Sequence, residues 1–81
     1  MKDEILKHVC YTELVYDRIN KKLKKNFTKE EIEKFIFDVL DKTNDECFFK
    51  NGKNIYVYSK KSGIKITINS KTFRIITVDI I

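Results

Sequence analysis

The sequence predicts an α+β fold, in which two N-terminal helices pack on one face of a four-stranded antiparallel meander sheet. Residues 1–45 place apolar side chains at helical spacing, and residues 46–81 alternate with the period of a strand. Asn51-Gly52, between two strand-like runs, is a hairpin signal. With 81 residues the chain has room for a single domain, 1–81, with its helical layer at 1–45 and its sheet at 46–81.

The first predicted helix is amphipathic and lies within the first 25 residues. Its apolar residues recur at helical spacing: Ile5, Leu6, Val9, Leu14, Val15, Ile19 and Leu23. Cys10-Tyr11-Thr12 is a weak patch, where the helix is interrupted or begins again with Thr12 as its N-cap. Lysines near the C-terminal end favour the helix dipole, and Asn26 suits the left-handed residue that ends the helix.

The second predicted helix has the clearest start signal in the chain. Thr28 and Glu31 have the spacing of a capping box, and Phe27 is placed to contact Ile32 as a hydrophobic staple. One apolar stripe follows, made of Ile32, Phe35, Ile36, Val39 and Leu40. This helix is therefore expected to bury that stripe in the core.

Four strands are expected after the helices. Residues 47–50 and 54–58 form a hairpin through Asn51-Gly52, and residues 64–69 alternate cleanly. In the last run, 72–81, the alternation fails at Ile75-Ile76, which predicts a β-bulge or strong bend there.

The alternation assigns side chains to the two faces of the sheet. The helices are expected to cover Ile55, Val57, Ile64, Ile66, Ile68 and Val78. With the bulge, the opposite face is expected to show Tyr56, Tyr58, Lys65, Thr67, Asn69, Arg74 and Thr77.

Positive charge is concentrated in the predicted sheet. The net charge is +5, yet residues 1–47 hold ten basic and eleven acidic residues, whereas residues 48–81 hold seven basic residues and Asp79 alone. Such a field attracts anions without choosing among them. The alternative is that these lysines only keep a small sheet soluble and protect its edges.

The exposed face predicts a surface that binds a nucleic acid or a nucleotide. Basic groups neutralise phosphates, aromatic rings stack on bases, and Thr and Asn supply short hydrogen-bonding groups. The candidate ligand-binding residues are Lys53, Tyr56, Tyr58, Lys65, Thr67, Asn69, Lys71, Arg74 and Thr77. Tyr and Thr also favour strands in the absence of any ligand, and Arg74 has an ion pair with Asp79 or a helix carboxylate as its alternative.

No catalytic or metal-ligating set is predicted. His8 is the single histidine, and Cys10 and Cys47 have no metal-site spacing and are expected to act as small apolar residues. Two glycines exclude a glycine-rich phosphate loop. We therefore expect no cofactor and no metal.

A cytoplasmic protein without membrane contact is expected. No apolar run approaches the ~18 residues of a membrane span, and the start Met1-Lys2-Asp3-Glu4 does not resemble a signal peptide. The apolar run Val78-Asp79-Ile80-Ile81 suggests that this edge is covered by a second copy in a homodimer. A protein partner is thus the second functional hypothesis.

A third hypothesis is RNA cleavage without a metal, in which the RNA 2′-hydroxyl is the nucleophile. Its candidate residues are Tyr56, Lys65, Thr67, Arg74 and Thr77. The helix-helix-sheet order, with the run 74–78 in the last strand, resembles the small helix-plus-sheet ribonuclease toxins. Those toxins often place a histidine four residues before an arginine, whereas Leu14 stands four residues before Arg18 here.

Several segments resemble one bacterial family. They are the run 10–23 (Cys10-Tyr11-Thr12-Glu13 through Leu23), Gly52-Lys53-Asn54-Ile55-Tyr56, Ile66-Thr67-Ile68-Asn69-Ser70 and Arg74-Ile75-Ile76-Thr77. The family is catalogued as domain of unknown function 3781 and brings no activity, cofactor or catalytic residue. The resemblance implies a small stand-alone bacterial or phage-borne protein. Short basic proteins of this type include phage counter-defence factors that sequester nucleotides or inhibit a host protein.

Overall fold

The computed structural model describes residues 1–81 and has three α-helices followed by four strands. The helices are α1 (Lys2–His8), α2 (Glu13–Leu23) and α3 (Lys29–Lys42), and the 3-10 turn η1 (Asp45–Cys47) leads into the sheet. The strands are β1 (Phe48–Asn51), β2 (Asn54–Ser59), β3 (Ile64–Asn69) and β4 (Ile75–Ile80). They form one antiparallel sheet in the order β1-β2-β3-β4, which confirms the expected α+β meander.

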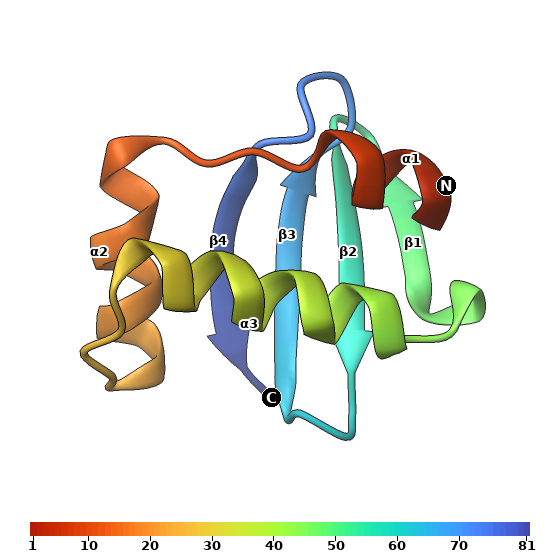
Figure 1. The fold of residues 1–81 in the computed structure, drawn as a ribbon. Helices are drawn as coiled ribbons and strands as arrows, with labels where there is room; N and C mark the ends of the chain where they lie inside the picture. The colour runs from red at the N-terminus through yellow and green to blue at the C-terminus, as the bar shows by residue number, and fades with distance from the viewer.

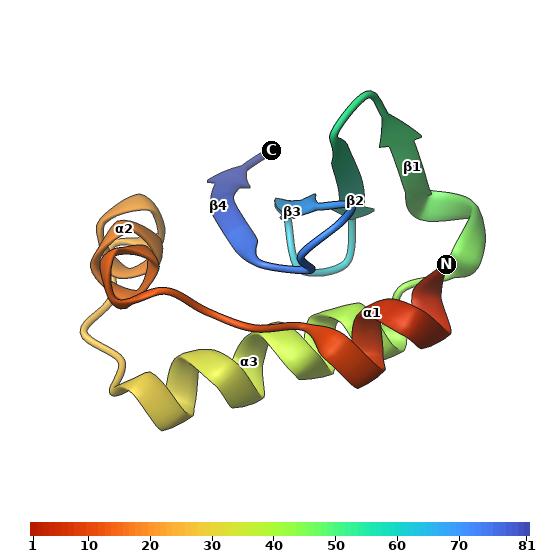
Figure 2. The ribbon, with the colours of Figure 1, turned by 90° about the horizontal axis from the view of Figure 1, so that it is seen from above.

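The helices surround the sheet on one face and at one edge. α3 runs across the four strands, with α1 beside it (Figure 1). Seen from above, β1 and β4 both curve away from α3, so the face opposite α3 is concave and no helix covers it (Figure 2). α2 lies beside β4 rather than under the sheet (Figure 2). The first predicted helix is thus represented by two helices, α1 and α2. α1 and α3 lie on the covered face, while α2 flanks the β4 edge.

The first predicted helix is broken in two because its weak patch pairs with the sheet. Val9 already has extended backbone, with φ −54° and ψ 132°. The N–H of Cys10 donates to the carbonyl of Phe73 (3.0 Å), and the carbonyl of Cys10 accepts from the N–H of Ile75 (2.9 Å). Cys10 and Arg74 thereby form a parallel bridge just before β4. The helix resumes after Thr12, which occupies the N-cap position without a side-chain capping bond.

The two longer helices differ in how well their ends were predicted. The Thr28–Glu31 capping box is present, with Thr28 Oγ1 accepting from the N–H of Glu31 (3.2 Å) and Glu31 Oε1 accepting from the N–H of Thr28 (2.8 Å). α2, however, ends at Lys24, whose φ is +57°, and not at Asn26. The Asn20 side chain bonds both backbone groups of Phe27, which turns the chain into α3.

The turns and the bulge follow the sequence pattern closely. The two-residue loop between β1 and β2 is Gly52-Lys53, one residue later than the expected Asn51-Gly52, because Asn51 pairs with Asn54; Gly52, at φ +64°, takes its first position, which favours glycine. Thr67 pairs with Thr77, while its neighbour Ile68 pairs with Ile75. Ile76 is therefore the extra residue of a β-bulge, which confirms the prediction at Ile75-Ile76.

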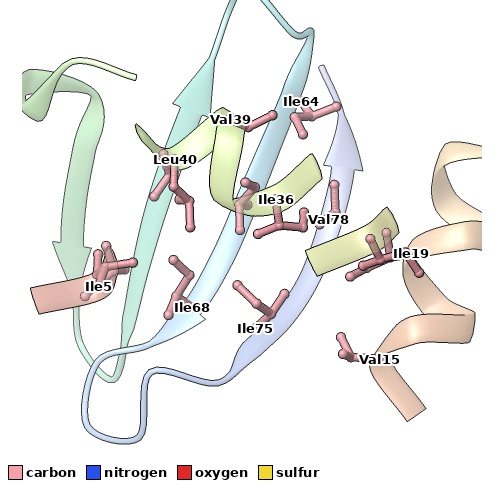
Figure 3. Close-up of a cluster of buried hydrophobic side chains, with 14 of the residues drawn as sticks. Ile5, Val15, Ile19, Ile36, Val39, Leu40, Ile64, Ile68, Ile75 and Val78 are labelled. Atoms are coloured by element: carbon pink, nitrogen blue, oxygen red, sulfur yellow. The ribbon is translucent and has the colours of Figure 1, made fainter. Parts of the chain in front are cut away.

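The core lies between the sheet, α1, α2 and α3 (Figure 3). Fifteen apolar residues form one buried cluster, to which Ile5 contributes from α1, Val15 and Ile19 from α2, and Leu40 from α3. The strands contribute every residue that the pattern assigned to the covered face, namely Ile55, Val57, Ile64, Ile66, Ile68 and Val78. Leu14 is the exception among the predicted apolar positions of the first helical segment, since its side chain is 78% exposed.

The helices are short. α3, the longest, has 14 residues. No helix combines the length and apolarity that crossing a bilayer requires.

Candidate functional site

The strand register builds a polar and aromatic surface opposite α3, here called the open face. One row across the four strands is Phe49, Tyr56, Thr67 and Thr77. A second row is Tyr58, Lys65 and Asp79, and a third is Asn51, Asn54 and Asn69. The open face consists of these ten residues. It includes five of the candidate residues on strands β2 and β3 as well as Thr77 of β4.

Aromatic rings surround the one lysine at the centre of the open face. Lys65 Nζ lies 5.7 Å from the ring centre of Tyr56 and 6.0 Å from that of Tyr58. The ring of Phe49 contacts Tyr58 edge-on, with centroids 5.8 Å apart. Phe49 is 53% exposed and Tyr58 is 37% exposed, so ring surface remains available to a ligand. A cation held at aromatic rings is also partly fixed in place.

The two threonines form the deepest part of the open face. Thr67 is only 5% exposed. Thr77 Oγ1 is buried and makes no hydrogen bond within the chain. Beside them, the Tyr56 hydroxyl accepts a hydrogen bond from Asn54 Nδ2 at 3.3 Å. The Thr77 hydroxyl therefore has no partner within the chain that would compete with a ligand for its hydrogen bonds.

Two candidate lysines meet at one end of the open face. Lys53 lies in the β1–β2 loop and Lys71 in the β3–β4 loop, and both are exposed. The N–H of Ser70 donates to the carbonyl of Lys53 (2.8 Å), which holds the two loops together. Asn69 Oδ1 accepts from the N–H groups of Lys71 (2.8 Å) and Thr72 (2.9 Å). The Asn69 side chain therefore shapes this turn.

More lysines lie at the other end. Lys60 and Lys61 are in the β2–β3 loop, and together with Lys42 at the end of α3 they line a cavity of about 250 Å³. The side chain of Tyr58 also lines this cavity. The open face is thus bordered by exposed lysines at both ends.

The positive charge of the sheet is not neutralised within the chain. The three ion pairs are Lys22–Asp79, Lys29–Glu13 and Lys42–Asp38. None of the seven basic residues of 48–81 takes part in them. The only carboxylate of that segment, Asp79, lies 2.7 Å from Lys22 of α2. This leaves a field that favours anions over the open face.

Arg74 is the candidate residue that lines a different cavity, although its carbonyl accepts from the N–H of Asn69 at 2.9 Å. It precedes β4, bridges Cys10, and lines a cavity with Arg18 of α2. It forms no ion pair with Asp79. The alternation along the last strand placed Arg74 on the open face, whereas in the structure Arg74 bridges Cys10 of the α1–α2 segment and lines the cavity beside α2. The set proposed for RNA cleavage thus comes together only as Tyr56, Lys65, Thr67 and Thr77.

The distinctive aromatic residues of the first motif lie elsewhere. Tyr11 and Tyr16 stack with ring centroids 5.5 Å apart, and the Tyr16 hydroxyl donates to Glu33 Oε2 of α3 at 2.6 Å. Partial burial, with this hydrogen bond, raises the pKa of Tyr16 to about 12. Burial also raises the pKa of Tyr11, whose hydroxyl has no partner. Lys29 lies over the Tyr16 ring at 5.3 Å, and its hydrogen bond to Glu13 raises its pKa. This cluster joins α2 to α3.

The remaining chemistry-bearing residues are dispersed. The ring of His8 lies against Phe73 at 5.7 Å, and both cysteines are free thiols. No three His, Cys, Asp or Glu side chains come together in the chain. The open face, with its exposed rings and its lysines, is by contrast a surface on which an anionic, aromatic ligand can be held.

Two residues of interest had not been predicted from the sequence. Phe49 extends the aromatic surface of the open face, and the alternation of residues 47–50 could have placed it beside Tyr58. Arg18 stands with Tyr11 and Tyr16 in the distinctive run 10–23, which left a functional role open, but its position beside Arg74 depends on how α2 packs against β4.

Comparison with known proteins identifies the family. No curated protein and no solved structure matches the chain. A family model described as protein of unknown function (DUF3781) matches residues 3–79. The chain therefore belongs to the DUF3781 family, as the motifs between Cys10 and Thr77 had suggested.

Proposed function

We propose that this protein is a non-catalytic binding module that holds single-stranded nucleic acid across its open face. The observation that supports this most is the contact of Lys65 with the rings of Tyr56 and Tyr58, extended by Phe49, in a segment whose cations form no ion pair within the chain. Single-strand binding combines ring surfaces for the bases with cations along the backbone. Four-stranded sheets that present aromatic side chains are a known platform for such binding.

The spacing of the groups fits a short run of nucleotides. Tyr56 and Tyr58 lie two residues apart on one strand, so their Cα atoms are separated by about 7 Å. Lysines lie at both ends of the open face, where the nucleic-acid strand would enter and leave. They are Lys53 with Lys71 at one end and Lys60 with Lys61 at the other. The open face is concave (Figure 2), so it can accept a narrow single strand more readily than the wide cylinder of a duplex.

The test is fluorescence anisotropy of labelled single-stranded RNA, single-stranded DNA and duplex DNA at several salt concentrations. Each phosphate neutralised on a single strand contributes about −0.7 to the slope of log K against log salt. If Lys53, Lys60, Lys61, Lys65 and Lys71 are all engaged, the slope is about −3.5. A mononucleotide in the same assay, used as competitor, separates binding of a strand from binding of a small nucleotide.

Two variants distinguish the two parts of the proposed site. Lys65→Gln should weaken binding and reduce the slope by about 0.7. Tyr58→Leu should weaken binding by about 1–3 kcal/mol with the slope unchanged, because it removes stacking and no charge. Lys34→Gln is the matched control, since Lys34 is exposed on α3, in no ion pair, and on the other side of the sheet. Equal effects of Lys65→Gln and Lys34→Gln would contradict the proposal.

RNA cleavage is tested on the same samples. Analysis of the RNA after prolonged incubation should show intact strands under the proposed function. If RNA fragments form with the wild type but not with the Lys65→Gln variant, the function is RNA cleavage and not binding alone.

A further inference from the structure

A second cavity, which has both arginines of the chain among its lining residues, lies outside the open face, between α2 and the beginning of β4. It has a volume of about 220 Å³. Arg18 lines it from α2 and Arg74 from the residue before β4. The chain has seventeen basic residues, and Arg18 and Arg74 are its only arginines. Both therefore line one small cavity, although 56 positions separate them in the sequence.

The two guanidinium groups have no counter-charge there. No Asp or Glu lines the cavity, and neither arginine is in an ion pair. Arg18 Nη1 donates to the carbonyl of Ile76 at 3.3 Å, which anchors this side chain at the bulge. The side chain of Arg74 makes no hydrogen bond within the chain. Arginine keeps its charge at all ordinary pH values, so both groups stay cationic at this cavity.

An oxyanion would supply the counter-charge that this cavity lacks. Guanidinium groups bind phosphate and carboxylate oxygens through paired N–H donors. Two fixed positive charges match a phosphate monoester, whose charge is about −1.5 to −2 at pH 7, better than a carboxylate or a phosphodiester with a single charge. The volume is below the ~300 Å³ at which small-molecule pockets begin, so the cavity fits the phosphate group and leaves the rest of its ligand outside.

The walls of the cavity agree with a ligand that extends out of it. Leu14, at the rim, is 78% exposed although it belongs to a helix whose other apolar residues pack inward. Ile76, the bulged residue, forms part of the opposite wall. These apolar surfaces would contact whatever carries the phosphate.

We propose that Arg18 and Arg74 form a binding site for a phosphate monoester in the cavity between α2 and β4. This site is independent of the open face, because none of its lining residues belongs to that face. The monoester is either that of a small phosphorylated molecule or the terminal phosphate of a nucleic acid.

The test is NMR observation of the arginine Nε–H groups during titration with phenyl phosphate. Two arginines give two such signals, which single substitutions assign. Both signals should shift with one common dissociation constant. Methyl phenyl phosphate, the corresponding diester, should bind about tenfold more weakly, since one charge-assisted contact is lost. If neither signal moves, or if the diester binds as well as the monoester, the proposal is wrong.

The decisive variant is Arg74→Gln, because the Arg74 side chain has no intramolecular partner whose loss could unfold the protein. It should lower affinity for phenyl phosphate about tenfold or more. Lys21→Gln, an equal change of charge at an exposed position of α2 three residues from Arg18 and in no ion pair, is the matched control and should leave this affinity unchanged. Equal losses in the two variants would overturn the proposal.

The source of the phosphate is distinguished by two oligonucleotides that differ only in a 5′-phosphate or a 5′-hydroxyl end. If the nucleic-acid end is the ligand, the phosphorylated strand binds more tightly and Arg74→Gln removes the difference. If a small molecule is the ligand, both strands bind alike and only phenyl phosphate depends on Arg74. Tyr58→Leu, which tests the open face, should leave the phenyl phosphate affinity unchanged in either case.

Discussion

Replacing Tyr11 by Phe is expected to stabilise the protein. The Tyr11 side chain is largely buried, and its hydroxyl makes no hydrogen bond. Its ring stacks on Tyr16 with centroids 5.5 Å apart, a contact that Phe would keep. The substitution therefore removes one desolvated polar atom and almost nothing else.

The size of the effect follows from the cost of an unsatisfied buried hydroxyl, which is about 1–3 kcal/mol. Tyr11 is incompletely buried, so we expect a gain near the lower end, about 1 kcal/mol. For a domain of this length, 1 kcal/mol raises Tm by about 4–8 °C.

Tyr16→Phe is the matched control, since it makes the same chemical change on the other ring of the stacked pair. The Tyr16 hydroxyl donates to Glu33 Oε2 at 2.6 Å. Loss of that bond at a partly exposed site should cost about 0.5–1 kcal/mol. The same deletion is thus expected to act with opposite sign at the two positions.

Thermal and urea unfolding followed by circular dichroism at neutral pH measures both variants against the wild type. A Tyr11→Phe variant that melts below the wild type, by as much as Tyr16→Phe does, would refute the reasoning. It would show that the Tyr11 hydroxyl has a hydrogen-bond partner in solution.

Three further predictions concern stability. The pKa of Tyr16 is raised in the folded protein to about 12 from its usual value of about 10. The contribution of the Tyr16 hydroxyl to the free energy of unfolding is therefore complete below pH 10 and is lost as pH rises through 12. The difference in unfolding free energy between wild type and Tyr16→Phe, measured by urea unfolding, should shrink over that range. Thr28→Ala removes the capping box and should cost about 1 kcal/mol by the same assay, whereas Thr12→Ala, at a cap without a side-chain bond, should cost less. Ile66→Val, at a fully buried position in the central part of the sheet, should cost about 0.5–1.5 kcal/mol, measured as a lowered urea midpoint with an unchanged slope.

The features that the sequence predicted correctly depend on neighbours along the chain. The capping box of Thr28 and Glu31 needs only four residues, and the two-residue loop at Gly52 needs only its own backbone freedom. The bulge at Ile75-Ile76 was predictable because two adjacent apolar residues cannot both keep the alternation of a half-buried strand. In each case the local pattern and the final packing agree.

The features that were missed depend on contacts between distant segments. The break at Cys10-Tyr11-Thr12 was predicted, but its cause was not: Cys10 pairs with the residues at the start of β4, a contact that no local pattern contains. Arg74, the residue that bridges Cys10, lines a cavity with Arg18, which alternation along the strand does not predict. Helix periodicity placed Leu14 in an apolar stripe, but once α2 forms separately and packs beside β4, Leu14 points to solvent.

The candidate site was predictable to a similar extent. Alternation along β2 and β3 placed Tyr56, Tyr58, Lys65 and Thr67 on one face, and the register confirms that they lie together. The register also aligns Thr77 with Thr67. The burial of Thr67 follows from the curvature of the sheet, which a pattern of alternating residues does not encode.

The most direct test of the central claim is to map where a single-stranded oligonucleotide binds. Backbone amide shifts of the labelled protein are recorded during titration with a short single-stranded RNA at low salt. The largest changes are predicted at Tyr56, Tyr58 and Lys65, with α3 unaffected around Lys34. Changes centred on α3, or no saturable change at low salt, would contradict the assignment of the open face as a nucleic-acid-binding surface.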